Sequence, residues 1–184
     1  FKPLTAFVCH GAEGTGKGYF ANKIAAPLLG QINFTSKTVG DIEETFNAFL
    51  ANKLFCFVDE VDVDDFREKG RVTARLRNWI TEPTFSIRDM RKVAVDMNNY
   101  VSFLFSSNRP QPVFIPQSDR RYNVGNFQAH KLPRPDDDAV KNELMSFAEF
   151  LAAYKVDRDK ANTPLDTSER QNIQNISLTS AEET

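Results

Sequence analysis

Residues 11 to 18 read GAEGTGKG, and this glycine-rich stretch decides the fold because of what flanks it. An apolar run, Leu4 to Cys9, precedes it and is typical of a buried strand. A helix-like stretch, Tyr19 to Leu29, follows it. A strand, a glycine-rich loop and a helix in this order are the context that a phosphate-binding loop requires.

The residue types of this loop suit the phosphates of a nucleoside triphosphate. Its glycines let backbone N–H groups curl around an anion, and the helix N-terminus adds partial positive charge. Lys17 is placed to reach the outer phosphates, whereas Gly18 stands where Ser or Thr normally ligates Mg²⁺. The alternative is a glycine-rich turn that happens to carry a lysine. The expected nucleotide-binding residues are Gly11, Glu13, Gly14, Thr15, Gly16, Lys17 and Gly18.

Composition bounds the class of protein. The chain has 184 residues, of which 41% are hydrophobic, enough for one domain with a buried core. It has no apolar run of bilayer length and no signal-peptide pattern, so we expect no membrane partner. Its two cysteines lie in apolar runs and fit a reducing, intracellular setting. The first residue is Phe rather than Met, so we expect a piece of a longer polypeptide.

Charge is distributed unevenly along the chain, although the net charge is only −2. From Arg67 to Lys92 there are eight basic and three acidic residues, and from Asp136 to the end there are eleven acidic and five basic residues. A basic middle segment permits contact with nucleic acid. A solvated helix face accounts for the same charges equally well.

The order of elements predicts an α/β domain with a central parallel sheet flanked by helices, plus a β-hairpin at residues 84–99. Ligands of such sheets lie at the carboxyl ends of the strands. Residues 1–135 form the expected core, residues 136–156 a helix packed on it, and residues 157–184 a polar tail or linker. Strands are expected at residues 4–9, 31–34, 54–60, 100–105 and 120–124, and helices at residues 19–29, 41–50, 71–80 and 136–155.

Polar residues end two of the expected buried strands. Asp59 and Glu60 follow the apolar run at residues 54–58, where a Walker B pair belongs: the first acid holds Mg²⁺ and the second polarises the attacking water. Acids that end a strand at the surface are the alternative. Asn108 closes the next strand in the sequence FSSN, where an amide orients water against the γ-phosphate or simply occupies a turn.

Five segments of the chain occur in the order seen in superfamily 3 helicases. They are GAEGTGKG, LFCFVDE, the basic segment IRDMRKVAVDMNN, FLFSSN and DRRYNV. These are AAA+ P-loop ATPases of viruses, phages and plasmids, and the chain most resembles the helicase domains attached to phage-type primase-polymerases. The resemblance covers roughly residues 4 to 125.

The resemblance implies an AAA+-like fold, ATP and Mg²⁺ as ligands, and the residue roles of the family. Lys17 would be the phosphate lysine, Asp59 the metal acid, Glu60 the catalytic base and Asn108 the sensor asparagine. Arg120 or Arg121 would be an arginine finger that reaches the ATP of a neighbouring subunit. The hairpin cations Arg88, Arg91 and Lys92 would contact single-stranded DNA.

The partners implied are single-stranded DNA, further copies of the chain in a ring, usually a hexamer, and other domains of a longer replication polypeptide. The family suggests 3′ to 5′ translocation in the cytoplasm of the host cell. A preceding helical domain commonly assembles such rings and is not evident in this sequence. The alternatives are an initiator-like or clamp-loader-like AAA+ motor and a nucleotide-dependent ring or scaffold, for which Gly18 is the main argument.

Overall fold

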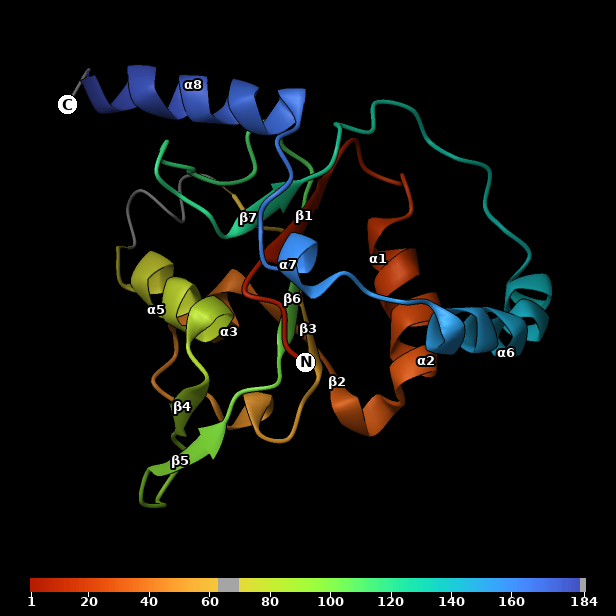
Figure 1. The fold of residues 1–184 in the computed structure, drawn as a ribbon, viewed down its shortest axis with the longest axis horizontal. Helices are drawn as coiled ribbons and strands as arrows, with labels where there is room; N and C mark the ends of the chain where they lie inside the picture. The colour runs from red at the N-terminus through yellow and green to blue at the C-terminus, as the bar shows by residue number, and fades with distance from the viewer. Residues whose placement is uncertain (63–69, 183–184) are drawn as a thin grey trace.

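A central sheet of five parallel strands organises the computed structural model, which describes residues 1–62 and 70–182 (Figure 1). Its order is β2-β3-β6-β1-β7. The α/β class predicted from the sequence is therefore confirmed, with the parallel sheet and flanking helices. The strands are β1 Ala6–His10, β2 Phe34–Thr38, β3 Phe55–Asp59, β6 Ser102–Ser107 and β7 Tyr122–Val124.

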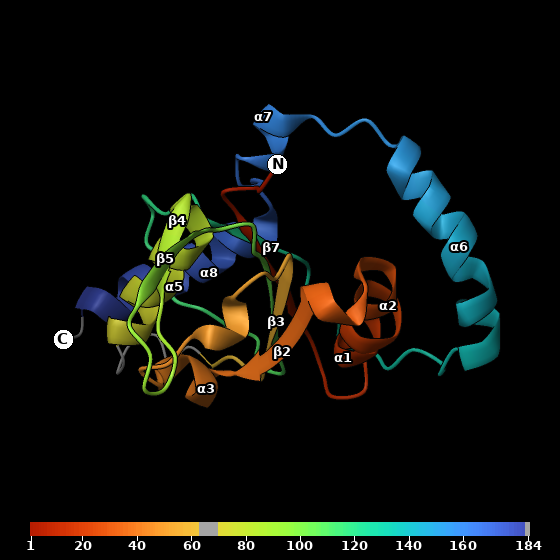
Figure 2. The same cartoon turned by 90° about the horizontal axis from the view of Figure 1, so that it is seen from below.

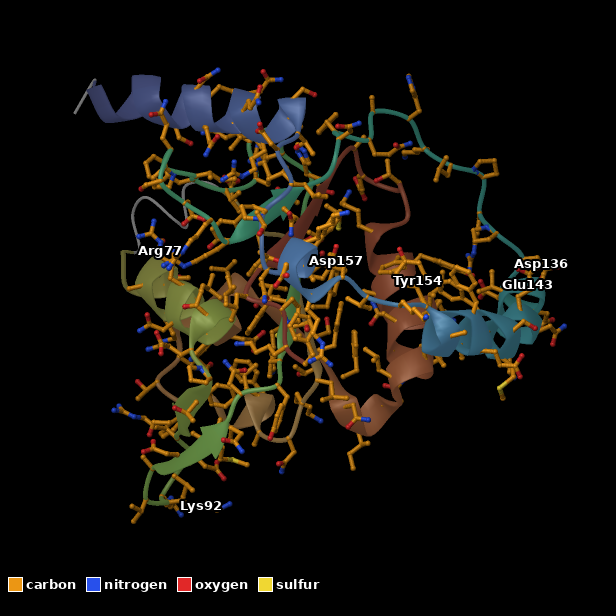
Figure 3. All side chains as sticks on the ribbon, viewed as in Figure 1. Arg77, Lys92, Asp136, Glu143, Tyr154 and Asp157 are labelled. Atoms are coloured by element: carbon orange, nitrogen blue, oxygen red, sulfur yellow. The ribbon has the colours of Figure 1, made fainter. Side chains whose placement is uncertain are left out.

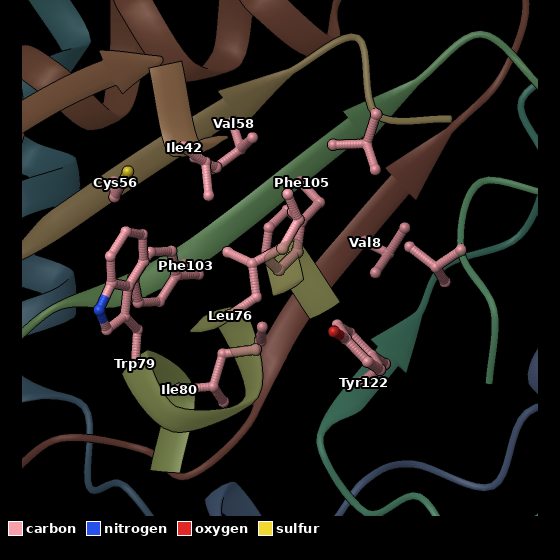
Figure 4. Close-up of a cluster of buried hydrophobic side chains, with 14 of the residues drawn as sticks. Val8, Ile42, Cys56, Val58, Leu76, Trp79, Ile80, Phe103, Phe105 and Tyr122 are labelled. Carbon is pink, nitrogen blue, oxygen red and sulfur yellow. The ribbon is translucent and has the colours of Figure 1, made fainter. Parts of the chain in front are cut away.

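Helices cover both faces of the sheet. Because successive residues of a strand point to opposite faces, each strand contributes side chains to the core on either side. On one face lie α3 (Val39–Glu43) and α5 (Gly70–Thr81), and the larger core forms there. Figure 4 shows Leu76, Trp79 and Ile80 of α5 against Phe103 and Phe105 of β6. The other face carries one continuous helical stretch, α1 (Lys17–Tyr19), the π-helical η1 (Phe20–Ala25) and α2 (Ala26–Leu29), with Phe57 and Leu104 buried beneath it.

A separate antiparallel hairpin, β4 (Thr84–Ile87) and β5 (Val95–Asn98), projects beyond the sheet, as the views in Figures 1 and 2 show. Asn47 fixes its base: the Asn47 side chain accepts from the Arg88 N–H at 2.7 Å and donates to the Ser86 carbonyl at 3.0 Å. The hairpin predicted at residues 84–99 is therefore confirmed.

Two elements differ from the prediction. Gln31–Asn33 forms a 3₁₀ turn (η2), and the strand begins only at Phe34. The helix expected at residues 41–50 is divided into α3 and a 3₁₀ turn, η3 (Ala48–Leu50), because α3 ends at Glu43. Arg75 stabilises this early end by donating to the carbonyls of Ile42 and Glu44, which a longer helix would have used internally.

The C-terminal third also departs from expectation. A helix does form, α6 (Asp137–Ala153), capped by Asp136, but none of its residues is buried. Figure 2 shows it standing apart from the sheet, so it is not packed on the core. Contacts of α6 with the described helices and strands are mainly with η1. The apolar periodicity of residues 136–156 predicted a packing face, but its members Phe147, Leu151 and Tyr154 are exposed, as is the neighbouring Phe150.

Residues 157–182 form helices rather than the expected tail or linker; residues 183 and 184 lie outside the described chain. These helices are α7 (Arg158–Ala161) and α8 (Ser168–Glu182). Ile173 of α8 is buried, and the Ser177 hydroxyl accepts from the Ile115 N–H. The buried Ile173 and the hydrogen bonds of α8 to residues 115–119 therefore hold this helix beside β7, where a sparse apolar pattern predicted no packing. The division into domains otherwise stays a prediction.

No helix within residues 1–62 and 70–182 has both the length and the apolar character that crossing a bilayer requires.

Candidate nucleotide site

The glycine-rich loop connects β1 to α1, as the sequence predicts. Gly14 and Gly16 have φ of 78° and 93°, a left-handed conformation that favours glycine. The Lys17 ammonium donates to the carbonyls of Gly11 at 2.8 Å and Ala12 at 3.0 Å, and to the Thr15 hydroxyl at 3.2 Å. Desolvation lowers the pKa of Lys17 from its ordinary value, opposed by nearby groups that include Asp59. The Lys17 side chain therefore lies against the glycine-rich loop, whose phosphate site it is expected to complete.

Opposite the loop, Asp59 ends β3. Its Oδ1 accepts a short hydrogen bond from the Ser106 hydroxyl of β6 and a second from the Glu60 N–H at 3.1 Å. Glu60 has φ of 56°, a left-handed conformation that costs a non-glycine residue of the order of 1–3 kcal/mol. Because β6 lies between β1 and β3, its carboxyl end brings Asn108 between the loop and the acids. Ser106 was not singled out from the sequence, since a serine at a strand end carries no distinctive pattern.

A cavity of about 820 Å³ joins these groups. Lys17, Asp59, Glu60 and Asn108, which are far apart in the sequence, all line it. So do the predicted loop residues Gly14, Thr15, Gly16 and Gly18. The cavity has the size typical of a small-molecule site, and its charged groups gather at the carboxyl ends of the strands.

Gly11 and Glu13 do not line this cavity. The Gly11 N–H already donates to the Ser107 carbonyl at 3.1 Å, and a Cβ on Gly11 would lie 2.4 Å from the Gln128 carbonyl oxygen. Glycine is therefore needed at this position because another segment of backbone approaches closely, which is a different reason from contact with phosphate.

That segment, residues 126–135, is called the strap here. It crosses the glycine-rich loop: Ala12 N–H donates to the Gln128 carbonyl at 2.8 Å, and Gln128 N–H donates to the His10 carbonyl at 3.0 Å. The Lys131 side chain lies over Gly14. The strap then supplies Leu132, Pro133, Arg134 and Pro135 to the cavity wall. Sequence reasoning missed it because it contains no helix or strand periodicity.

The two arginines proposed as an arginine finger lie outside the cavity. Arg121 pairs with the buried Asp119, with Nη1 3.0 Å from Oδ2. Arg120 is exposed. Between the two, Arg120 is the one whose side chain is available to a neighbouring molecule.

The basic hairpin residues also lie apart from the cavity. Arg88, Arg91 and Lys92 are exposed, and Figure 3 shows Lys92 at the hairpin tip, far from α6. Lys92 is paired with Asp89 at 2.7 Å, so Arg88 and Arg91 are the better candidates for an anionic partner. Residues 67–69 of the predicted basic segment lie outside the described chain.

Comparison with known proteins agrees with the phage resemblance. The family model for DUF5906, described as a family of unknown function, matches residues 9–121, more than half of the chain. The DNA primase-polymerase of Nitratiruptor phage NrS-1 is 30% identical over 164 residues, which are 85% of this chain and 22% of that protein.

Solved structures of that phage protein have a similar fold. The apo structure of the NrS-1 C terminal region gives a TM-score of 0.83 at 28% identity and covers 95% of this chain and 43% of that one. An A form apo structure of the same region gives 0.79 at 28% identity, with 95% and 42% covered. The chain is therefore homologous to part of that C-terminal region and spans less than half the length of each protein matched.

Proposed function

The chain belongs to the DUF5906 family, and we propose that it is the ATP-hydrolysing helicase domain, of superfamily 3 and AAA+ type, of a phage DNA replication protein. The observation that carries this proposal is the convergence of Lys17, Asp59, Glu60 and Asn108 on one cavity. Its homology to the NrS-1 DNA primase-polymerase supports a replication role in the host cytoplasm.

The polar groups that line the cavity divide the work of phosphoryl transfer. Lys17 neutralises the outer phosphates, Glu60 accepts a proton from the attacking water, and Asn108 orients that water. Arg120 of a neighbouring copy completes the site in a ring, because no arginine other than Arg134 lines the cavity of the described chain. Opening and closing of such interfaces would move the hairpin along single-stranded DNA.

Asp59 fits a role as a magnesium ligand. Its carboxylate is oriented by Ser106 and by the Glu60 N–H, and it faces the cavity. Magnesium in nucleotide sites is typically held by one or two carboxylates together with substrate phosphates and water, so Asp59 would hold it with the triphosphate and water. When bound, Mg²⁺ supplies positive charge to the β- and γ-phosphates.

Gly18→Ser tests the missing hydroxyl. Among the described residues, no heavy atom beyond the adjacent residues and the backbone of the same helix lies within 4 Å of a Cβ built on Gly18, so serine fits. We expect the variant to reach half-maximal ATPase activity at a Mg²⁺ concentration about three- to tenfold lower, because the serine hydroxyl adds an oxygen ligand. Gly18→Ala is the control. Equal Mg²⁺ dependence in both variants contradicts the expected ligand position.

A nucleotide-dependent scaffold is the second candidate, and Gly18 is the observation that favours it. The two functions differ in a direct experiment on the full polypeptide, namely ATP-dependent displacement of one strand of a forked DNA duplex. The helicase proposal expects displacement that stops in Lys17→Ala. Nucleotide-dependent oligomers with negligible turnover and no displacement support the scaffold.

Arg88→Ala/Arg91→Ala tests the hairpin. For single strands, each phosphate contact contributes about −0.7 to the slope of log affinity against log salt concentration. Removal of two contacts should therefore make the slope of the double variant less negative by about 1.4. Binding of a fluorescent oligothymidine is measured across a salt series. Lys141→Ala/Lys155→Ala removes the same charge from exposed residues elsewhere and should leave the slope unchanged. Equal slopes in both double variants place the DNA contact away from the hairpin.

A further inference from the structure

The cavity is lined by more than the groups assigned to phosphate, and the rest of its lining has a different character. It comes from Leu132, Pro133 and Pro135 of the strap, Val140 of α6, and Phe20 and Ile24 of η1, and these residues are called the apolar end. The strand ends and the loop supply Lys17, Asp59, Glu60 and Asn108, which are called the polar end. One cavity therefore combines charged and apolar groups, as the triphosphate and the nucleoside of a nucleotide require.

The strap is anchored at both ends. At its start, Gln128 is bonded to His10 and Ala12 across the glycine-rich loop. Just beyond its end, Asp137 accepts from the Tyr19 hydroxyl at 3.0 Å, and its Oδ2 lies 3.6 Å from both Lys23 and Arg134. The pKa of Asp137 is lowered from its ordinary value, chiefly because Tyr19 donates this hydrogen bond, so the Asp137 carboxylate is ionised at neutral pH. The apolar wall is held against the helix that carries Lys17.

The apolar end offers few groups that distinguish one base from another. Pro133 and Pro135 have no backbone N–H, and the Tyr19 hydroxyl is already bonded to Asp137. Arg134 is the polar side chain of the strap at this end, and a guanidinium stacks on the face of any base. Leu132 is 62% exposed, so its side chain has apolar surface available to a bound nucleoside.

We propose that the strap and the first turn of α6 bind the nucleoside of the triphosphate by apolar contact, and that they accept any of the common bases. This inference rests on the proposed function, because it takes the phosphates to lie on the glycine-rich loop. A second cavity of about 550 Å³, lined by Phe7, Cys9, Phe55 and Leu104 and sharing Thr15, Gly16, Lys17 and Phe20, is the rival position for the base.

Titration calorimetry of the full polypeptide with ATP, GTP, CTP, UTP and inorganic tripolyphosphate tests the proposal. The four nucleotides should bind within about fivefold of one another and at least about tenfold more tightly than tripolyphosphate, since burial of one apolar side chain accounts for such a factor. Leu132→Ser should weaken all four nucleotides about tenfold and leave tripolyphosphate unchanged. Ile32→Ser is the matched control, because Ile32 is 77% exposed and lines neither cavity.

Each other outcome has a defined meaning. Unchanged nucleotide affinity in Leu132→Ser overturns the strap as the nucleoside site, and a loss on Phe7→Ser instead assigns it to the second cavity. A preference of more than about fiftyfold for one base overturns the inference that any base is accepted. Failure of the unmodified protein to bind nucleotides or tripolyphosphate overturns the proposed function itself, which is a different result from failure of the strap.

Discussion

Glu60→Gln is expected to lower ATP turnover by about 10² to 10⁴-fold while leaving ATP affinity within about threefold, because a general base contributes factors of that size. Glu60 lines the cavity beside Asp59 and Asn108. Glutamine has the same length and retains the left-handed backbone strain at this residue, so the fold should not change. The measurement is steady-state phosphate release, paired with binding of a fluorescent ATP analogue.

Glu149→Gln is the matched control, since Glu149 is exposed and lines neither cavity. It should retain turnover within about twofold of the unmodified protein. Glu60→Gln with full turnover would remove Glu60 from the role of base. An equal loss in both variants would show that the effect arises from charge in general rather than from position.

Gly11→Ala is expected to lower the free energy of unfolding by about 3 kcal/mol. Overpacking by the added methyl group and weakening of the nearby backbone hydrogen bonds together account for a loss of this size. The added Cβ would lie 2.4 Å from the Gln128 carbonyl oxygen and 2.9 Å from its nitrogen. Both are backbone atoms, so a rotamer change cannot relieve the clash. The strap would have to move, and with it the contacts of Ala12 and His10 with Gln128.

Urea denaturation measures this effect, with Gly18→Ala as the control. Gly18 lies in a helix with open space at its Cβ position, so alanine there should be neutral or stabilise the protein by about 0.5–1 kcal/mol. Equal stability of Gly11→Ala and the unmodified protein would contradict the close approach of the strap to the loop.

The elements that the sequence predicted correctly share strong local signals. Uninterrupted apolar runs predicted β3 and β6, and closely spaced glycines predicted the loop between β1 and α1, where the structure shows two of them with φ above zero. Asp59, Glu60 and Asn108 were identified because they end such runs. Parallel strands then bring their carboxyl ends to one edge, and this explains why Lys17 and Asn108, 91 positions apart in the sequence, line one cavity.

The features that were missed depend on tertiary contacts between polar groups. Gln174 and Arg170 of α8 donate to backbone carbonyls of residues 116, 117 and 119, and such bonds leave no apolar periodicity in the sequence. The strap is irregular, and only its hydrogen bonds to the glycine-rich loop assign it a position. For α6, periodicity correctly predicted a helix, but it did not reveal that the apolar side would be exposed.

The most direct test of the central claim is the rate of ATP hydrolysis by the full polypeptide, with and without single-stranded DNA, beside Lys17→Ala. Lys17 is the only group of the cavity's polar end that carries positive charge within the described chain. The account predicts turnover that single-stranded DNA stimulates and that Lys17→Ala abolishes. Absence of turnover in an assembled protein, or turnover that survives Lys17→Ala, would contradict it.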